Sequence, residues 1–440
     1  RRAHKENIWD LSLASPPPII PRHLRLGVTE RIDYSGNVIT PLDETETRKV
    51  VNQLKAENVI AIAVCTLFSF MNPVHEMRIR EIILEEYPEC YVSISSEILP
   101  QIREYERSST TAVNAYVGPV LGSYLFKLQK KLADAGLKRE VLVTQSNGGI
   151  MSASYGVEHG ASTLLSGPSA GAVGGMFFAK QLSLPNLIVM DMGGTSYDVS
   201  LIKDGNYYMT TEGEIARYRV ALPMIDIHTI GAGGGSLAYL DQGNMLKVGP
   251  QSAGAVPGPA CYGKGGTKPA TTDINVILGY INPDFYLGGE FAIDKQASYD
   301  AVKQVIADPL NIDTINAAYG IYTVVNNNMA DATRVVSVEK GHDPRDFSLV
   351  AAGGAGALHA CKIAEIVGIP RVIVPKTASV FCAMGMLESD LKHDYVRTLW
   401  KPLDNIDFNE VNQAFDAMEA EARATLLAEG LNENQIQIER

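Results

Sequence analysis

The apolar positions of the chain alternate between short continuous runs and longer segments with helical spacing. The short runs predict buried strands over residues 59–64, 91–94, 141–144, 187–190 and 372–374. The helical spacing predicts helices over residues 45–57, 72–86, 103–132, 312–340 and 408–430. Alternation of strand and helix is the signature of an α/β domain with a largely parallel sheet.

One predicted strand leads into a glycine turn with an acid on each side. The apolar run Leu187–Met190 brings Asp191 to Gly193, Gly194, Thr195 and Ser196, and a second strand follows after Asp198. Glycines let backbone N–H groups face an anion, hydroxyls add donors, and a carboxylate at the strand end can hold a hydrated Mg²⁺. We interpret the stretch as a strand-turn-strand phosphate loop. The alternative is an ordinary glycine-containing hairpin, which does not need two flanking acids.

Two further segments combine small residues with a predicted helix start. Residues 166–175 follow a predicted short strand at 163–165, and the pattern fits either an anion site at a helix N-terminus or a helix packed closely under a sheet. Residues 347–359 predict a strand, a turn with Gly353, Gly354 and Gly356, and a helix. Such a turn lets a nucleotide's base and ribose lie against the backbone. His359, on that helix, fits a packed residue better than a catalyst.

Three other polar residues are candidates for metal or substrate binding. Asp226 and His228 are two residues apart on a predicted strand, so their side chains share a face. Asp273 stands at the start of a predicted helix, where capping is the alternative explanation. A hydrogen-bonded structural pair is the alternative for Asp226 and His228. Cys261, with no histidine near it in sequence, is expected to be packed and not nucleophilic.

Composition limits the classes of partner. The net charge of -12 argues against nucleic acid or an anionic membrane surface as the main partner. The 5 cysteines show no zinc or disulfide spacing, and with no signal-peptide pattern the sequence favours a cytoplasmic protein. The length predicts more than one domain. We expect an N-terminal α/β lobe over residues 1–165, a nucleotide-binding α/β lobe over 166–397, and a linker with the start of an incomplete domain over 398–440.

Two strand-associated glycine turns predict a nucleotide cleft, yet the usual nucleotide motifs are absent. The sequence contains no P-loop pattern of Gly-x-x-x-x-Gly-Lys-Ser/Thr, and no Gly-x-Gly-x-x-Gly follows a first strand. The site therefore belongs to another class of nucleotide fold.

A set of motifs, in a fixed order, runs along nearly the whole chain up to about residue 397. These motifs are residues 103–107 with Thr110 and Thr111, 145–149, 166–168, 191–198, 230–236, 258–263, 272–273, and 353–356 with His359. In these motifs the sequence resembles the hydantoinase A, 5-oxoprolinase and acetone or acetophenone carboxylase family, which has an actin-like, sugar-kinase-like (ribonuclease H-like) ATPase fold.

This resemblance implies a two-lobed α/β fold with mixed sheets flanked by helices, and an enzyme that uses ATP and Mg²⁺ (or Mn²⁺) to phosphorylate a carbonyl oxygen. Asp191 would position the metal or its waters, and Asp198 would orient the loop or the metal. Gly193, Gly194, Thr195 and Ser196 would hold phosphate oxygens, and Gly353, Gly354 and Gly356 would line the adenosine pocket. Asp226, His228 and Asp273 are candidates for a second divalent metal. The expected partners are a small carbonyl substrate and a companion subunit of the hydantoinase B type.

One departure from the family pattern leaves alternatives open. Family members begin with an Asp-x-Gly-Gly-Thr loop, the other half of the phosphate clamp, which is not found among these residues. A catalytically silent ATP-binding subunit and a small-molecule kinase of the same fold are therefore alternatives to a carboxylase or cyclic amidase. Residues 279–289 and 306–310 resemble the ketone carboxylases, whereas residues 258–263 resemble the hydantoinases, so the substrate is left open with a slight preference for a ketone.

Overall fold

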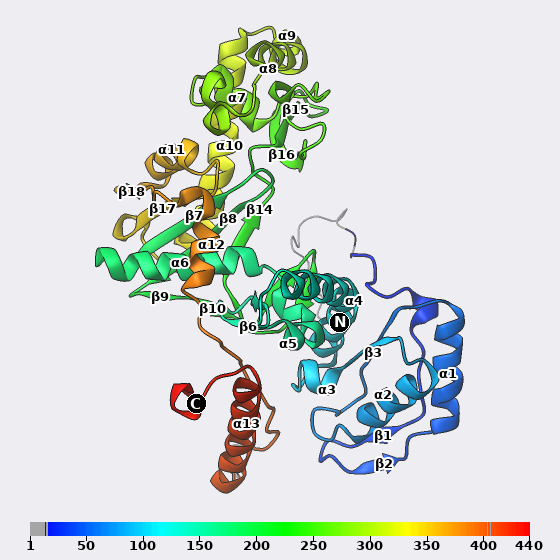
Figure 1. The fold of residues 1–440 in the computed structure, drawn as a ribbon. Helices are drawn as coiled ribbons and strands as arrows, with labels where there is room; N and C mark the ends of the chain where they lie inside the picture. Colours follow the sequence, from blue (N-terminus) through cyan, green and yellow to red (C-terminus); the bar gives the residue numbers. More distant parts are fainter. Residues whose placement is uncertain (1–13, 15, 403, 405) are drawn as a thin grey trace. The chain divides into compact units, whose positions relative to one another are not determined.

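The computed structural model describes residue 14, residues 16–402, residue 404 and residues 406–440 (Figure 1). The chain forms two compact units. The first comprises Arg1–Ser166, Thr210–Met224 and Asp390–Arg440, and the second comprises Gly167–Met209 and Ile225–Ser389. Residues 398–440 thus pack with the first unit, and their assignment to a further domain stays a prediction. In the described part of the chain, none of the helices has the length and apolar character that a bilayer crossing requires.

The first unit contains a parallel strand pair covered by helices on both faces. Strands β3 (Ala61–Val64) and β4 (Tyr91–Ile94) pair in register, with α1 (Glu44–Ala56) and α2 (Val74–Glu86) on one side and α4 (Glu104–Asp134) on the other. Its other elements are β1 (Arg31–Ile32), β2 (Val38–Thr40), α3 (Ser95–Ile98), β5 (Leu142–Thr144), β6 (Ile150–Ser152), α5 (Ala153–Glu158), β11 (Gly213–Ile215), β12 (Tyr218–Val220) and α13 (Phe408–Ala428).

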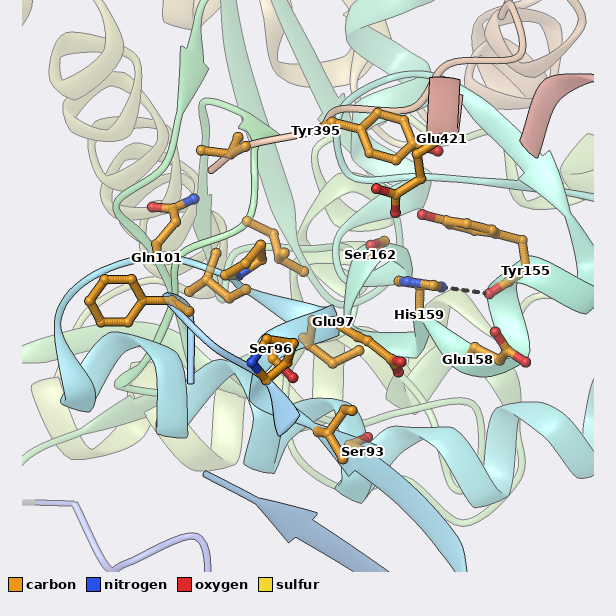
Figure 2. Close-up of a pocket in the computed structure, with 18 of the residues that line it drawn as sticks. Ser93, Ser96, Glu97, Gln101, Tyr155, Glu158, His159, Ser162, Tyr395 and Glu421 are labelled. Atoms are coloured by element: carbon orange, nitrogen blue, oxygen red, sulfur yellow. Dashed lines mark hydrogen bonds between the residues drawn. The ribbon is translucent and has the colours of Figure 1, made fainter. Parts of the chain in front are cut away.

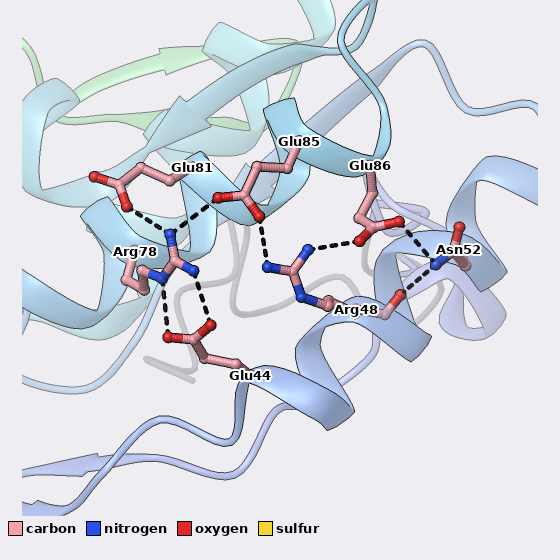
Figure 3. Close-up of polar contacts among 7 residues, drawn as sticks. All are labelled: Glu44, Arg48, Asn52, Arg78, Glu81, Glu85 and Glu86. Carbon is pink, nitrogen blue, oxygen red and sulfur yellow. Dashed lines mark hydrogen bonds and ion pairs between the residues drawn. The ribbon is translucent and has the colours of Figure 1, made fainter.

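Charged side chains link α1 to α2 on the surface of this unit (Figure 3). Arg78 donates to Glu44 at 2.8 Å, to Glu81 at 2.8 Å and to Glu85 at 3.1 Å. Arg48 bonds Glu85 and Glu86 at the other end of the same cluster. The hydrogen bonds that Arg78 donates to Glu44 raise the pKa of Arg78 and lower the pKa of Glu44. The cluster is solvated, so its effect on stability is expected to be small.

Replacing Arg78 with glutamine is expected to lower the melting temperature by roughly 1–3 °C at low ionic strength, because four carboxylates then lack one of two counter-charges. The difference should nearly vanish in 1 M salt, where the Debye length is about 3 Å. Arg139→Gln, at an exposed arginine of the same unit, is the control. Calorimetry at both salt concentrations checks this, and an equal shift in 1 M salt would contradict an ion-pair origin.

The first turns of α4, which contain the motif at residues 103–107, form hydrogen bonds with other segments of the first unit. Arg107 is buried, and its guanidinium donates to the carbonyls of Thr66 at 2.6 Å and Gln101 at 3.2 Å. Ser108 and Ser109 do not cap the helix, since their hydroxyls donate to the carbonyls of Glu104 and Arg219. This part of α4 therefore ties together segments of the first unit.

The predicted strand at 163–165 is wrong. Residues Gly160–Thr163 form a 3₁₀ turn, and Leu165 has a left-handed φ of 58°. Asn114 accepts the N–H of Ala161 at 2.9 Å, and Ser146 donates its N–H to the carbonyl of Ser162 at 2.7 Å. The segment is therefore an ordered loop, and its backbone groups form hydrogen bonds with a side chain and with another loop instead of with a neighbouring strand.

The second unit is built on a six-stranded mixed sheet of order β14-β8-β7-β17-β18, with β9 paired to β8. Strands β7, β17 and β18 are parallel, whereas β8 and β14 run antiparallel to their neighbours. Two short strands, β10 (Met209–Thr210) and β13 (Met224–Ile225), lie where the chain passes between the units. The other elements of the second unit are α6 (Ser166–Leu182), β7 (Leu187–Met192), β8 (Tyr197–Lys203), β9 (Asn206–Tyr207), β14 (Ile227–Ile230), β15 (Ser236–Leu240), β16 (Leu246–Ser252), α7 (Thr271–Ile277), α8 (Lys295–Val302), α9 (Asp308–Leu310), α10 (Thr314–Val336), β17 (Ser348–Ala352), α11 (Ala357–Val367), β18 (Arg371–Ile373) and α12 (Phe381–Leu387).

Helices cover both faces of this sheet (Figure 1). Ile188, Met190 and Val199 pack on one face in a cluster with α10 and α11, whereas Val189 and Ile202 pack on the other with α6 and α12. A Cβ added at Gly175 of α6 would lie 2.5 Å from side-chain atoms of both Val189 and Ile202. The small residues of α6 thus allow a close helix-sheet contact, one of its two expected roles. The predicted α/β fold class is confirmed.

Candidate functional site

The predicted phosphate loop is a tight hairpin between two strands of the central sheet. Met192 of β7 lies opposite Tyr197 of β8, and the N–H of Gly193 donates to the carbonyl of Ser196 at 3.3 Å. Gly194 and Thr195 are exposed at the tip. A Cβ added at Gly193 or Gly194 would meet nothing within 4 Å, so open space adjoins the turn.

A second glycine segment fixes the orientation of this turn. The N–H groups of Gly234 and Gly235 donate to the carbonyls of Gly193 at 2.9 Å and Gly194 at 2.7 Å. A Cβ at Gly233 would come within 3.0 Å of the backbone of Thr195, so only glycine permits the contact. Within the described residues, the N–H groups of Gly194 and Thr195 have no acceptor. The turn therefore offers donors to an anion, while the carbonyls of Gly193 and Gly194 are bound by the second glycine segment.

The two flanking acids lie side by side. Asp191 pairs with Asp198 across β7 and β8, so the two carboxylates share one face of the sheet. The thiol of Cys382, on α12, donates to the Oδ2 of Asp191 over 2.8 Å. Burial, together with the Asp191 carboxylate, raises the pKa of Cys382, so the sulfur keeps its proton and stays a donor. The thiol thus orients the carboxylate that the sequence assigned to the metal.

Asp198 is held by two hydroxyl groups. Ser196 donates to its Oδ2 at 3.0 Å and Thr229 to its Oδ1 at 2.6 Å. Burial raises the pKa of Asp198 against the effect of these hydrogen bonds, and the nearby charge of Asp191 raises it further. Asp198 therefore stabilises the turn through Ser196, and its pKa depends on the charge of Asp191.

The predicted adenosine turn adjoins the same carboxylate. Strand β17 is parallel to β7 with Ala352 opposite Asp191, and Gly353 follows with a φ of 80°. The N–H of Ala355 donates to the carbonyl of Met192 at 3.0 Å. A Cβ at Gly354 would meet nothing within 4 Å, so this turn also has an open side. The structure therefore brings the Gly353–Gly356 turn and the Gly193–Ser196 turn together at one edge of the sheet.

Asp226 and His228 lie elsewhere. His228 pairs with Val199, whose neighbour Asp198 faces the opposite side of the sheet, so His228 and Asp191 are on different faces. Asp226 forms an ion pair with Lys340. Burial and the charge of Lys340 lower the pKa of His228. Asp226 lies between β13 and β14 and not on the strand of His228, so the prediction that both residues lie on one strand is wrong. Both residues lie near Lys340, and they are not part of the phosphate-loop site.

Asp273 is buried, and its carboxylate stabilises the loop that contains Ala260 and Cys261. Its carboxylate accepts the N–H groups of Ala260 at 3.0 Å, Cys261 at 2.8 Å and Ala270 at 2.8 Å, and the hydroxyl of Ser298 at 2.8 Å. The bond from Ala270 is the helix-capping contact considered for it. Both oxygens are thus occupied. Burial raises the pKa of Cys261, which is packed as expected.

No group of three or more His, Cys, Asp or Glu side chains placed to hold a metal ion occurs among the described residues. Asp226, His228 and Asp273 do not converge, and a second metal there stays a prediction. Cation binding by Asp191 also stays a prediction, and it would need no such cluster, since Mg²⁺ usually keeps several waters and takes only one or two carboxylates.

His359 is a packed histidine. Its Nε2 accepts from the amide of Asn275 at 3.1 Å and its Nδ1–H donates to Asn326 at 3.2 Å, so the ring is neutral. The ring stacks on Tyr322 at a centroid distance of 5.3 Å. Burial lowers the pKa of His359 from its ordinary 6.5 to about 4. The expectation of a packed residue is confirmed.

This histidine is expected to make the protein sensitive to acid. Between pH 6.5 and about 4 an unfolded histidine binds a proton that folded His359 does not, so stability falls as the pH falls through this window. At about 1.4 kcal/mol per pH unit, the loss is about 3 kcal/mol. Urea unfolding from pH 7 to 4 should show this extra loss in the wild type but not in His359→Gln. Parallel stability curves for the two proteins would contradict it.

The site includes contacts that the sequence analysis did not assign. Cys382 and Asp191 are 191 residues apart, and a lone cysteine in a small-residue segment carries no local signal of such a contact. Thr229, which bonds Asp198, was equally unassigned. Gly233 and Gly235 lie in a family motif, at residues 230–236, but their role against the phosphate turn follows only from the structure.

Comparison with known proteins finds matches over nearly the whole chain. Residues 107–395 match the hydantoinase/oxoprolinase family, and residues 1–87 match its N-terminal region. The chain is 40% identical to the caprolactamase subunit alpha of Pseudomonas jessenii over 98% of its own length and 62% of that protein. It is 40% identical to the acetophenone carboxylase gamma subunit of Aromatoleum aromaticum over 94% of its length and 58% of that protein.

Solved structures of the same kinds of protein match nearly the whole chain. The crystal structure of the ATP-dependent caprolactamase from Pseudomonas jessenii matches with a TM-score of 0.84 and 39% identity, over 99% of this chain and 64% of that one. Nucleotide-free acetone carboxylase matches with a TM-score of 0.82 and 31% identity, over 96% of this chain and 61% of that one. The chain thus spans about three fifths of these relatives. On these matches and the shared motifs, the chain belongs to the hydantoinase/oxoprolinase family.

Proposed function

We propose that this protein is a subunit of an ATP-dependent enzyme that phosphorylates a carbonyl oxygen of a small substrate, with Mg²⁺ or Mn²⁺ as the metal. The observation that carries the proposal is the edge of the second unit's sheet, where Asp191, Asp198 and two open glycine turns meet. Relatives named as an ATP-dependent caprolactamase and as carboxylases support the reaction class.

The residues present fit a nucleotide. The N–H groups of Gly194 and Thr195 have no acceptor among the described residues and both residues are exposed, so these groups would bind phosphate oxygens, with the hydroxyl of Thr195 as a further donor. The open side of Gly354 would lie against the adenosine, and Gly356 allows the chain to turn tightly into α11. These donors are preorganised, because the carbonyls of Gly193 and Gly194 are already bound by Gly234 and Gly235.

The carboxylates fit a hydrated divalent cation. Asp191, oriented by Cys382, would hold the metal or its waters, and Asp198 would fix the turn through Ser196. ATP would supply a phosphoryl group that turns a carbonyl oxygen into a better leaving group or traps an enolate. The protein's part is positioning and charge neutralisation, with no need for a covalent intermediate on a side chain.

The substrate is proposed as a class: a cyclic amide that is then opened, or a ketone that is then carboxylated. One relative of each kind is 40% identical to this chain. Because relatives are named as subunits alpha, beta and gamma, we also propose a companion subunit of the hydantoinase B type.

ATP hydrolysis by the full-length protein, alone and with its companion subunit, tests the function. Caprolactam, 5-oxoproline and a hydantoin represent the cyclic amides, and acetone and acetophenone with bicarbonate represent the ketones. We expect substrate-dependent phosphate release with one class only. Nucleotide binding without substrate-dependent hydrolysis in every combination would contradict an enzymatic role, and a stable phosphorylated product would identify a kinase.

A further inference from the structure

A large cavity lies within the first unit, apart from the phosphate-loop residues. Its volume is about 1090 Å³, slightly above the usual range of about 300–1,000 Å³ for small-molecule sites. One wall consists of all four residues of β4, Tyr91–Ile94, followed by Ser96–Gln101. The facing walls come from α5, His159 and residues 393–397 (Figure 2). A cavity that follows a strand along its length suits an extended ligand better than a compact one.

The strand along this wall has an open edge. Within the described chain, β4 pairs with β3 and with no other strand. The N–H of Tyr91 donates to the carbonyl of Ile60 at 3.1 Å, so the backbone groups of Tyr91 face β3. Because these directions alternate along a strand, the N–H and carbonyl of Val92 face away from β3. Val92 is only half-buried. An accessible edge of this kind is a template for another strand.

The charged side chains that line the cavity determine which charge a ligand should carry. The lining carboxylates are Glu97, Glu158, Asp394 and Glu421. The two lining guanidinium groups are already paired, Arg80 with Glu97 at 2.6 Å and Arg397 with Glu421 at 3.2 Å. Among the described residues Glu158 and Asp394 form no ion pair, and Asp394 accepts the amide of Asn147 at 2.7 Å. Figure 2 shows Glu97, Glu158 and Glu421 around the ring of His159, which stacks on Tyr155. The cavity therefore favours a positively charged ligand.

We propose that this cavity binds an extended peptide segment of a partner protein that carries lysine or arginine at alternate positions. The segment would add a strand to the outer edge of β4 and bond the backbone of Val92. Side chains alternate along a strand, so one set would reach the lining carboxylates while the other packs on apolar wall residues such as Val157 and Ile98. The proposal concerns the first unit alone and does not depend on the proposed function.

The probe is a fluorescent Lys-Val-Lys-Val-Lys-Val-Lys peptide, titrated against the full chain at low salt and followed by anisotropy. It should bind at least tenfold more tightly than the same peptide with glutamate in place of lysine. Methylating the amide nitrogens of alternate residues should abolish binding for one of the two possible sets and be tolerated for the other, because only one set faces β4. No saturable binding, or equal effects of both methylation patterns, would overturn the proposal.

Two pairs of variants localise the binding. Val92→Pro removes the outward N–H of an edge strand without touching the ladder to β3, and should weaken binding at least tenfold. Val92→Ala loses the same side chain but keeps the N–H, and should bind within about twofold of wild type. Glu158→Gln should weaken binding of the lysine peptide severalfold, whereas Glu89→Gln, which changes a residue outside the cavity, should leave the binding unchanged. Unchanged binding by both folded variants Val92→Pro and Glu158→Gln would overturn the proposal, as would self-association of the chain that the peptide does not displace.

Discussion

Asp191→Asn is expected to reduce substrate-dependent ATP hydrolysis by about a thousandfold or more, with the melting temperature nearly unchanged. Asparagine has almost the same shape and can still accept the thiol hydrogen of Cys382 through its Oδ1. It lacks the negative charge that a hydrated divalent cation requires. Loss of turnover without loss of fold therefore isolates the charge of Asp191. Phosphate release at saturating ATP and metal is the measurement.

The control for this change is Asp204→Asn. Asp204 is exposed in the turn between β8 and β9, at the end of β8 that is remote from the Gly193 turn, with a φ of 52° that asparagine adopts readily. It removes one negative charge from the same sheet and should leave turnover within about twofold of wild type. If Asp191→Asn retains turnover, Asp191 is not the metal-binding residue. If both variants lose turnover equally, the effect comes from net charge and not from the site.

The features that the sequence predicted correctly are those specified by short stretches of chain. The hairpin around Gly193 needs only two apolar runs and the turn between them, and the β17–α11 turn needs only a strand, glycines and a helix. In both cases the chain folds back within a few residues, so local pattern determines the result. Their meeting at one edge of the sheet follows from the parallel pairing of β17 with β7.

The features that were missed depend on contacts between distant segments. The alternation of side chains placed Asp226 and His228 on one face, but only the pairing of β14 with β8 shows that Asp191 is on the other. Asp273 was recognised as a helix-start acid, whereas its bonds to Ala260 and Cys261 require the folded loop. Short apolar segments such as 163–165 are ambiguous, because a few residues carry too little periodicity to distinguish a strand from a turn.

Gly353→Ala is expected to destabilise the second unit by about 2–4 kcal/mol and to abolish nucleotide binding. Gly353 has a φ of 80°, which alanine adopts only with strain. A Cβ there would lie within 3.0 Å of the carbonyl oxygen of Met192 and the carboxylate of Asp191. Because Met192 contributes a backbone atom, it cannot move aside without separating β17 from β7. The same methyl group would push Asp191 away from Cys382. Urea unfolding and calorimetric titration with ATP measure the two effects.

Gly354→Ala provides a matched control one residue away. A Cβ at Gly354 would meet nothing within 4 Å, and this residue is not among the glycines with positive φ. The change should therefore alter the free energy of unfolding by less than about 1 kcal/mol. Its methyl group would occupy the open side of the turn, so any weakening of ATP binding by a protein of normal stability would place the nucleotide there. Equal destabilisation by the two variants would show that the close contact of Gly353 with Met192 and Asp191 does not determine the conformation of this turn.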